Sequence, residues 1–65
     1  MEQKMDRFIK IGEVMEITGM SRSGVYRAMK HTEFPAQFKI STGGFSARWS
    51  LDEITAWMDA VKENR

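Results

Sequence analysis

Five polar side chains within one short stretch of the chain are of types that commonly contact nucleic acids. They are Arg22, Ser23, Tyr26, Arg27 and Lys30. On a helix, with about 100° between successive residues, four of them cluster on one side, Arg22 lies at the boundary, and Val25 and Ala28 fall opposite. Such a helix is suited to placing side chains against base edges in the major groove of DNA. A solvated amphipathic helix without a ligand would show the same pattern.

The elements that must position these side chains are two short helices around the turn Thr18-Gly19-Met20-Ser21. In the first helix, Ile11, Val14, Met15 and Thr18 have the spacing of a buried stripe. We expect Gly12 to cap its start. We expect Gly19 to end it, because only glycine adopts the left-handed conformation without steric cost. The second helix is expected to begin at Ser21, whose hydroxyl can accept hydrogen bonds from free backbone N–H groups.

A β-hairpin is expected after the second helix, because Phe34-Pro35 prevents the helix from continuing. Alternating apolar residues and a turn define its two arms: Phe38 and Ile40, the turn Ser41-Thr42-Gly43-Gly44, and then Ala47 and Trp49. The alternation predicts that these apolar residues share the face toward the core. The opposite face would then carry Lys39, Ser41, Ser46 and Arg48. A hairpin that only stabilises the fold, with solvated charges, is the alternative.

A third helix is expected from Ser50, because Ser50-Leu51-Asp52-Glu53 has the form of a capping box. Its apolar stripe consists of Ile54, Trp57, Met58 and Val61. Phe8 and Ile9 form an apolar segment that could be a short strand, and residues 1–6 are expected to be loose. The predicted fold is therefore α+β, a single small domain over residues 7–63 in which a two-stranded hairpin separates the second and third helices.

Charge is unevenly distributed along the 65 residues, although the formal net charge is only +1. Residues 20–50 carry five basic residues and one acidic residue, whereas residues 1–19 and 51–65 have net charges of −1 and −2. A basic middle between acidic ends indicates a localised surface that faces phosphate groups.

Several functional classes find little support in the composition. The chain has no cysteine, which excludes disulfides and thiolate metal sites and favours the cytoplasm. His31 is its only histidine, so a metal site is not expected. No long apolar segment suggests a membrane span. So small a chain has little room for a catalytic pocket, and we expect no enzyme activity, cofactor or small-molecule substrate.

A set of short motifs in a fixed order carries a family resemblance. The motifs are Ile11-Gly12-Glu13-Val14, Thr18-Gly19-Met20-Ser21-Arg22-Ser23, Val25-Tyr26-Arg27, Phe34-Pro35, Arg48-Trp49, Glu53-Ile54 and Trp57-Met58. Through them residues 8–61 resemble the AlpA family of small phage-type regulators, which is similar to the excisionases and more distantly to MerR-type regulators. The resemblance implies a winged helix-turn-helix fold and a DNA-binding regulator of transcription or excision. Gly24 departs from the family, which usually has a β-branched or hydroxyl residue there.

On this interpretation the second helix, from Ser21 onward, contacts double-stranded DNA. Arg27 is the candidate for a base edge, with Ser23 and Tyr26 beside it. Arg22 and Lys30 are expected to meet phosphates, which add affinity without selecting sequence.

The hairpin would act as the wing of the domain. Its tip, formed by Thr42, Gly43 and Gly44, is small enough to approach the DNA backbone or minor groove. Lys39 and Arg48 would anchor its base on phosphates. A domain of this size reads few base pairs, so a second copy on repeated sites is a further candidate partner, as is an integrase.

Two other functional classes fit parts of the sequence. A protein-interaction adaptor, such as an antirepressor or an integrase-binding subunit, would use an apolar interface that is insensitive to salt. An RNA-binding module fits less well, because the hairpin aromatics have the spacing of core residues and do not form a stacking surface.

Overall fold

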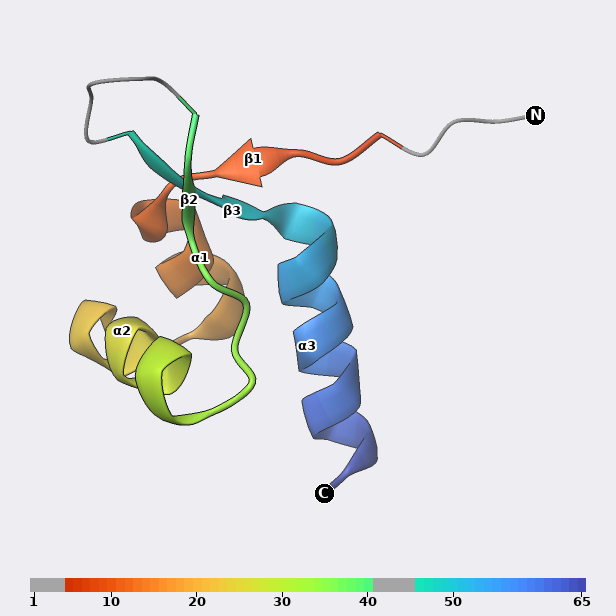
Figure 1. Ribbon diagram of the computed structural model, residues 1–65. Helices are drawn as coiled ribbons and strands as arrows, with labels where there is room; N and C mark the ends of the chain where they lie inside the picture. The colour runs from red at the N-terminus through yellow and green to blue at the C-terminus, as the bar shows by residue number, and fades with distance from the viewer. Residues whose placement is uncertain (1–4, 41–45) are drawn as a thin grey trace.

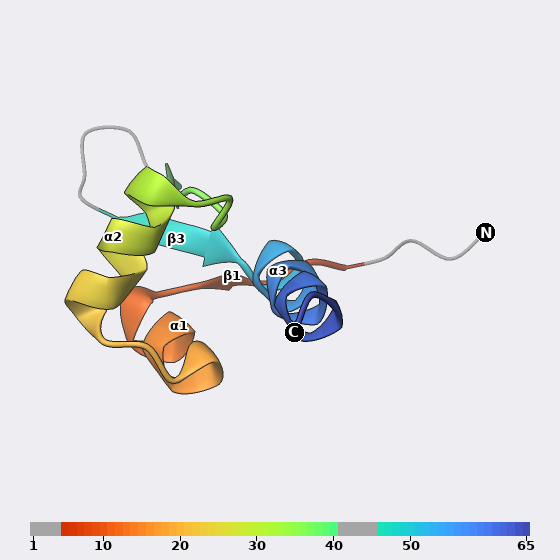
Figure 2. The same ribbon diagram turned by 90° about the horizontal axis from the view of Figure 1, so that it is seen from below.

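A computed structural model describes residues 5–40 and 46–65 of the chain. In chain order its elements are β1 (Phe8–Ile9), α1 (Ile11–Thr18), α2 (Arg22–His31), β2 (Phe38–Lys39), β3 (Ala47–Ser50) and α3 (Leu51–Glu63) (Figure 1). The three helices and the combination of helices with a sheet confirm the predicted α+β fold class. Figure 2 shows α1 and α2 together at one end of β3, whereas α3 leads away from the other end.

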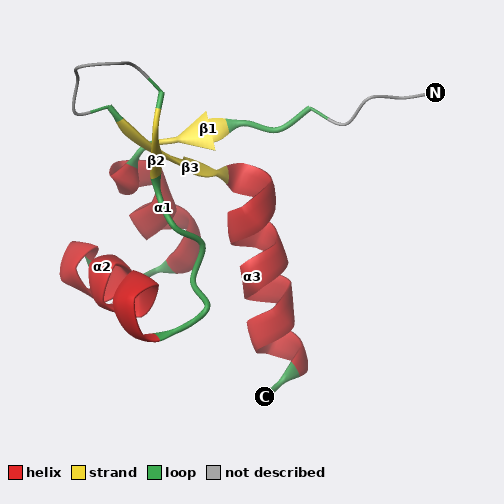
Figure 3. Ribbon diagram, in the orientation of Figure 1, coloured by secondary structure: helices red, strands yellow, loops and turns green. Residues whose placement is uncertain are grey.

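The sheet contains one strand more than the predicted hairpin. Its order is β1-β3-β2, and both neighbouring pairs are antiparallel (Figure 3). The apolar segment Phe8–Ile9 supplies the extra strand by pairing Phe8 with Ser50 and Ile9 with Trp49. The backbone N–H of Leu51 extends this pairing by donating to the carbonyl of Arg7 at 2.7 Å. The N-terminal strand therefore holds the junction between β3 and α3.

The predicted faces of the hairpin are wrong for its first arm. Phe38 pairs with Arg48, and Lys39 pairs with Ala47. Residues directly opposite in an antiparallel pair project from the same face, so Phe38 shares the face of Arg48. The reason is β1, because the Phe8 ring packs edge-on against Phe38 with centroids 4.9 Å apart. The predicted turn residues 41–44 lie outside the described part of the chain.

The two helices of the helix-turn-helix begin and end at local signals. The N-cap of α1 is Lys10, not Gly12, because the first helical hydrogen bond runs from Val14 N–H to the Lys10 carbonyl at 3.1 Å. Gly19 ends α1 in the left-handed conformation with φ 74°, which confirms the predicted stop. Ser21 caps α2 as predicted, since its Oγ accepts the N–H of Gly24 at 3.1 Å.

The start of α3 is held by two side chains. Ser50 Oγ accepts the N–H of Glu53 at 3.2 Å, which confirms the predicted cap. Asp6, assigned by the sequence to the loose segment, also binds here. Its carboxylate accepts the Ser50 hydroxyl and, at 3.0 Å, the N–H of Asp52. The anionic side chain thus lies at the positive end of the helix dipole.

Six fully or nearly fully buried side chains form the core, and they come from every part of the fold except β2. They are Ile9, Val14, Val25, Phe34, Trp49 and Ile54. Trp57 of α3 is half-buried and packs edge-on against Phe34 with centroids 4.7 Å apart. Val61 was predicted to continue the buried stripe but is 49% exposed, because it lies beyond the end of the core.

Candidate nucleic-acid interface

The outer face of α2 carries the polar residues that the sequence singled out. Arg22, Ser23, Tyr26, Arg27 and Lys30 are all exposed. Val25, on the opposite side, is completely buried in the core and fixes the rotation of the helix. The predicted division of α2 into two faces is therefore present, and the contacts of each exposed residue with DNA stay predictions.

The first turn of α2 explains the unusual glycine in this helix. Ser21 Oγ accepts the N–H of Gly24 and lies 3.4 Å from the hydroxyl oxygen of Ser23. A Cβ atom at position 24 would lie only 3.0 Å from Ser21 Oγ. Glycine thus leaves room for the capping hydroxyl beside the exposed face, at a cost of about 1 kcal/mol of helix propensity.

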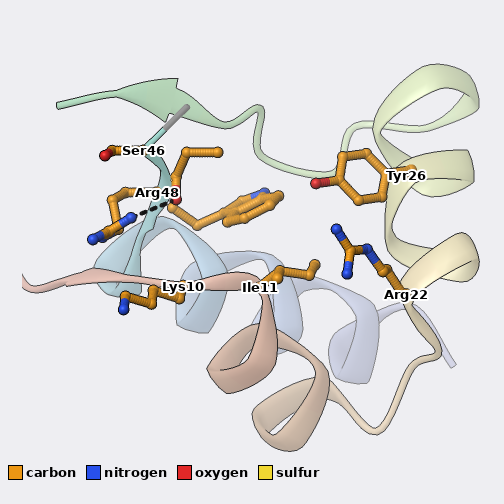
Figure 4. A pocket seen from close by; sticks show the side chains of 8 residues that line it. Lys10, Ile11, Arg22, Tyr26, Ser46 and Arg48 are labelled. Carbon is orange, nitrogen blue, oxygen red and sulfur yellow. Dashed lines mark hydrogen bonds between the residues drawn. The ribbon is translucent and has the colours of Figure 1, made fainter. Parts of the chain in front are cut away.

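A cleft of about 380 Å³ separates the start of α2 from β3 (Figure 4). It is lined by Lys10, Ile11, Arg22, Tyr26, Ser46, Ala47, Arg48 and Trp49. Arg22 and Tyr26 extend into it from α2, while Lys10 and Arg48 lie on the opposite side (Figure 4). Tyr26 also contacts the buried Trp49 ring, with centroids 6.1 Å apart and planes inclined by 71°. The helix and the strand are therefore joined by an aromatic contact beside a cationic cleft.

Among residues 5–40 and 46–65, no carboxylate forms an ion pair with a cation of this cleft. None of its lining residues is acidic. Between described residues, ion pairs join Arg7 to Glu13 at 3.2 Å and Lys62 to Asp59 at 3.4 Å, and neither involves a cleft residue. A concave surface lined by one sign of charge concentrates the field and attracts ions of the opposite sign. The cleft is thus suited to an anion.

One of the three cations that line the cleft was not predicted from the sequence, and several predicted cations lie outside it. Lys10 was not among the predicted contacts, because the basic region was counted from residue 20. Its position directly after an apolar segment and before the first helix was the available signal. Lys39, Arg27 and Lys30 are exposed but do not line the cleft.

Three of the predicted wing residues lie outside the described part of the chain. Thr42, Gly43 and Gly44 fall in the range 41–45, outside the described residues. The base of the wing is described: Lys39 is exposed on β2, and Arg48 is half-buried on β3. Arg48 Nη1 donates a hydrogen bond to the carbonyl of Ala47 at 3.0 Å, which holds the side chain close to its strand.

A second hollow, of about 610 Å³, has two glutamates as its charged lining residues and is called the acidic hollow. It is lined by Glu33, Pro35, Ala36, Phe38, Glu53, Ala56, Trp57 and Ala60.

Within residues 5–40 and 46–65, no group of three or more histidine, cysteine or acidic side chains is arranged to hold a metal ion. No described helix is both long enough and apolar enough to cross a membrane.

Comparison with known proteins agrees with the family resemblance that the motifs carry. The model of the family described as "Prophage CP4-57 regulatory protein (AlpA)" matches residues 7–62. The chain is also 43% identical, over 53 residues, to the uncharacterized protein ORF88 of Enterobacteria phage P4. That match covers 82% of this chain and 58% of the phage protein, so the chain spans little more than half of that relative's length. No solved structure matches the chain. The family match extends over most of the sequence, and the chain belongs to the AlpA family of prophage regulatory proteins.

Proposed function

We propose that the protein is a sequence-specific, double-stranded DNA-binding regulator of phage or mobile-element genes. The observation that carries this proposal is the exposed face of α2 together with the adjoining cationic cleft, which has no acidic lining residue. Binding of DNA by localised cations releases condensed counterions and supplies sequence-independent affinity. Side chains on a helix in the major groove then select the sequence. The regulatory family to which the chain belongs supports this function.

In this proposal α2 is the recognition helix. Arg27 contacts a base edge, for which guanine offers two acceptors to a guanidinium, and Ser23 and Tyr26 contact neighbouring bases. Arg22 and Lys30, near the two ends of α2, contact phosphates. The Ser21 cap and the buried Val25 hold the helix at a fixed orientation relative to the core.

The wing supplies the second set of contacts in the proposal. Lys39 and Arg48 project from opposite faces of the strand pair and anchor its base on separate phosphates. Thr42, Gly43 and Gly44 form a tip that approaches the backbone or minor groove. Because phosphate contacts do not select sequence, the wing adds affinity while α2 provides specificity.

The regulatory output depends on where the DNA sites lie. Sites in a promoter would make the protein a transcriptional regulator, whereas sites at an attachment region would make it an excisionase that directs recombination. In the second case an integrase is the natural partner, and repeated sites would place a second copy alongside the first. Footprinting on both kinds of DNA separates these outputs.

The test of DNA binding is selection from a library of random duplexes with the purified protein. We expect one motif to be enriched, and we expect the logarithm of its affinity to fall linearly with the logarithm of salt concentration, by a slope of about 0.9 for each phosphate contacted. Selection without enrichment, together with binding that ignores salt, would reject the proposal.

A second candidate function is a protein-interaction adaptor, such as an antirepressor or a subunit that binds an integrase. The acidic hollow beside the half-buried Trp57 favours it, because aromatic residues in hollows are common anchors at protein interfaces. An apolar interface there should tolerate high salt. Binding of an integrase without DNA, unchanged as salt rises, would support this function over the first.

A further inference from the structure

Lys10 occupies a position where a lysine does not help the protein to fold. It is the N-cap of α1, and its side chain makes no capping hydrogen bond. N-cap positions favour serine, threonine, aspartate and asparagine, and a cation is unfavourable at the positive end of a helix. Glu13, three residues later, is in the place where a capping box has its glutamate. Position 10 has no hydroxyl to cap the helix, and the carboxylate of Glu13 is paired with Arg7 at 3.2 Å.

Lys10 also lies beside another cation. The pairing of Phe8 with Ser50 and Ile9 with Trp49, continued by one residue, places Lys10 opposite Arg48. Both line the cleft, and Figure 4 shows their side chains on the same side of it. Like charges directly opposite each other on neighbouring strands are destabilising. No described carboxylate is within ion-pairing distance of either side chain.

We infer that Lys10 and Arg48 together bind one phosphate group of the DNA backbone, across the cleft from Arg22. An anion between the two cations removes their repulsion and offsets the unfavourable charge at the start of α1. The hydrogen bond from Arg48 to the Ala47 carbonyl holds the guanidinium close to its strand. The exposed Lys10 side chain makes no capping hydrogen bond that an anion would have to displace. This inference rests on the proposed DNA-binding function and adds to it the residue Lys10 and a shared phosphate.

The first test is Lys10→Ser, which supplies a capping hydroxyl at the start of α1 and removes one of the two like charges. Stability and binding are then expected to change in opposite directions. The Tm of the protein without DNA should rise by roughly 2 to 8 °C. Affinity for a duplex recovered by the random-library selection should fall by about 3- to 10-fold near 0.1 M salt.

Two further variants control this test. Lys62→Ser makes the same substitution in the last turn of α3, far along the chain from the cleft, and should leave DNA affinity within about 2-fold without raising the Tm. Lys10→Gln removes the charge without supplying a hydroxyl, so it should lose affinity like Lys10→Ser. Lys10→Gln therefore measures the effect of the lost charge on DNA affinity without the effect of a new helix cap.

The second test replaces the phosphates of the selected duplex one at a time with uncharged methylphosphonates. For the wild type, one position should weaken binding by about 3- to 10-fold because its contacts carry charge. In Lys10→Ser combined with Arg48→Ala, that penalty should disappear. In Arg22→Ala it should remain, because Arg22 lies on the other side of the cleft and contacts a neighbouring phosphate.

The failure of this inference is distinct from the failure of DNA binding. Wild-type affinity in both Lys10 variants, with normal selection by the wild type, would overturn the shared phosphate while leaving the proposed function intact. Persistence of the methylphosphonate penalty in the double variant would do the same. Absence of any DNA binding by the wild type would reject both.

Discussion

The cationic cleft and the acidic hollow are alike in construction and opposite in charge. Each has a tryptophan in its wall, Trp49 in the first and Trp57 in the second. The cleft combines its ring with three cations and no carboxylate, whereas the hollow has Glu33 and Glu53 among its lining residues. The two share no residue. A net charge of +1 thus conceals two surfaces of opposite charge.

The tryptophans of the two surfaces also differ in burial. Trp49 is completely buried in the core and contacts the Tyr26 ring of α2, so it links stability to the position of that helix. Trp57 is half-buried and contacts Phe34 beside the acidic hollow. The tryptophan that lines the cationic cleft is therefore a core residue, while the one at the acidic hollow keeps part of its area exposed.

The largest expected effect is the loss of Trp49. Trp49→Ala should destabilise the domain by about 3 to 5 kcal/mol, which is comparable to the total stability of so small a protein, and should leave it largely unfolded. Trp57→Ala removes a side chain that is only partly buried and should cost less, about 1 to 3 kcal/mol. Thermal melts followed by circular dichroism measure both. Equal losses would mean that the two aromatic walls have the same structural role.

A smaller effect is expected at the exposed face of α2. Arg27→Ala should weaken binding to the selected duplex by about 1 to 3 kcal/mol and relax the preference at one or two base pairs. Because Arg27 is exposed, the melting curve should stay close to that of the wild type. Fluorescence anisotropy with the selected duplex and its single-base variants gives both affinity and selectivity. Unchanged selectivity would assign base reading to Ser23 or Tyr26 instead.

The features that the sequence predicted correctly depend on neighbouring residues. The Ser21 cap, the Gly19 stop and the Ser50 cap each involve residues within four positions, and local hydrogen-bonding chemistry determines them. The division of α2 into a buried and an exposed face follows from helical periodicity alone. These local features position most of the candidate recognition residues.

The features that the sequence did not predict depend on residues far apart in the chain. Asp6 binds Ser50 and Asp52, which are 44 and 46 positions away. The pairing of β1 with β3 brings Lys10 to the side of the cleft that Arg48 also lines, and no local pattern carries that information. Alternation gives the period of a strand but not its register, so the face of Phe38 was assigned wrongly. The second side of the cleft could therefore be recognised only in the folded chain.

A still smaller effect is expected at the far end of α2. Lys30→Ala should weaken binding to all duplexes alike and reduce the salt slope by about 0.9, because a phosphate contact carries no sequence information. Titrations of specific and unrelated duplexes at several salt concentrations measure this change. A loss confined to the selected duplex would instead place Lys30 at a base edge and extend the reading surface of α2 toward His31.

The smallest effect is expected in the acidic hollow, where Glu33→Gln tests whether the two surfaces act separately. Glu33 is exposed, so its neutral isostere should change the free energy of unfolding by no more than about 0.5 kcal/mol. If the hollow faces away from DNA, affinity for the selected duplex should also stay within about 2-fold, since exposed charges beyond a Debye length are largely screened. Anisotropy titrations at about 0.15 M salt, near physiological ionic strength, provide the comparison. A clear gain in affinity that disappears at high salt would show that Glu33 repels phosphates in the complex. The acidic hollow would then border the DNA, and it would no longer be accessible to a protein partner.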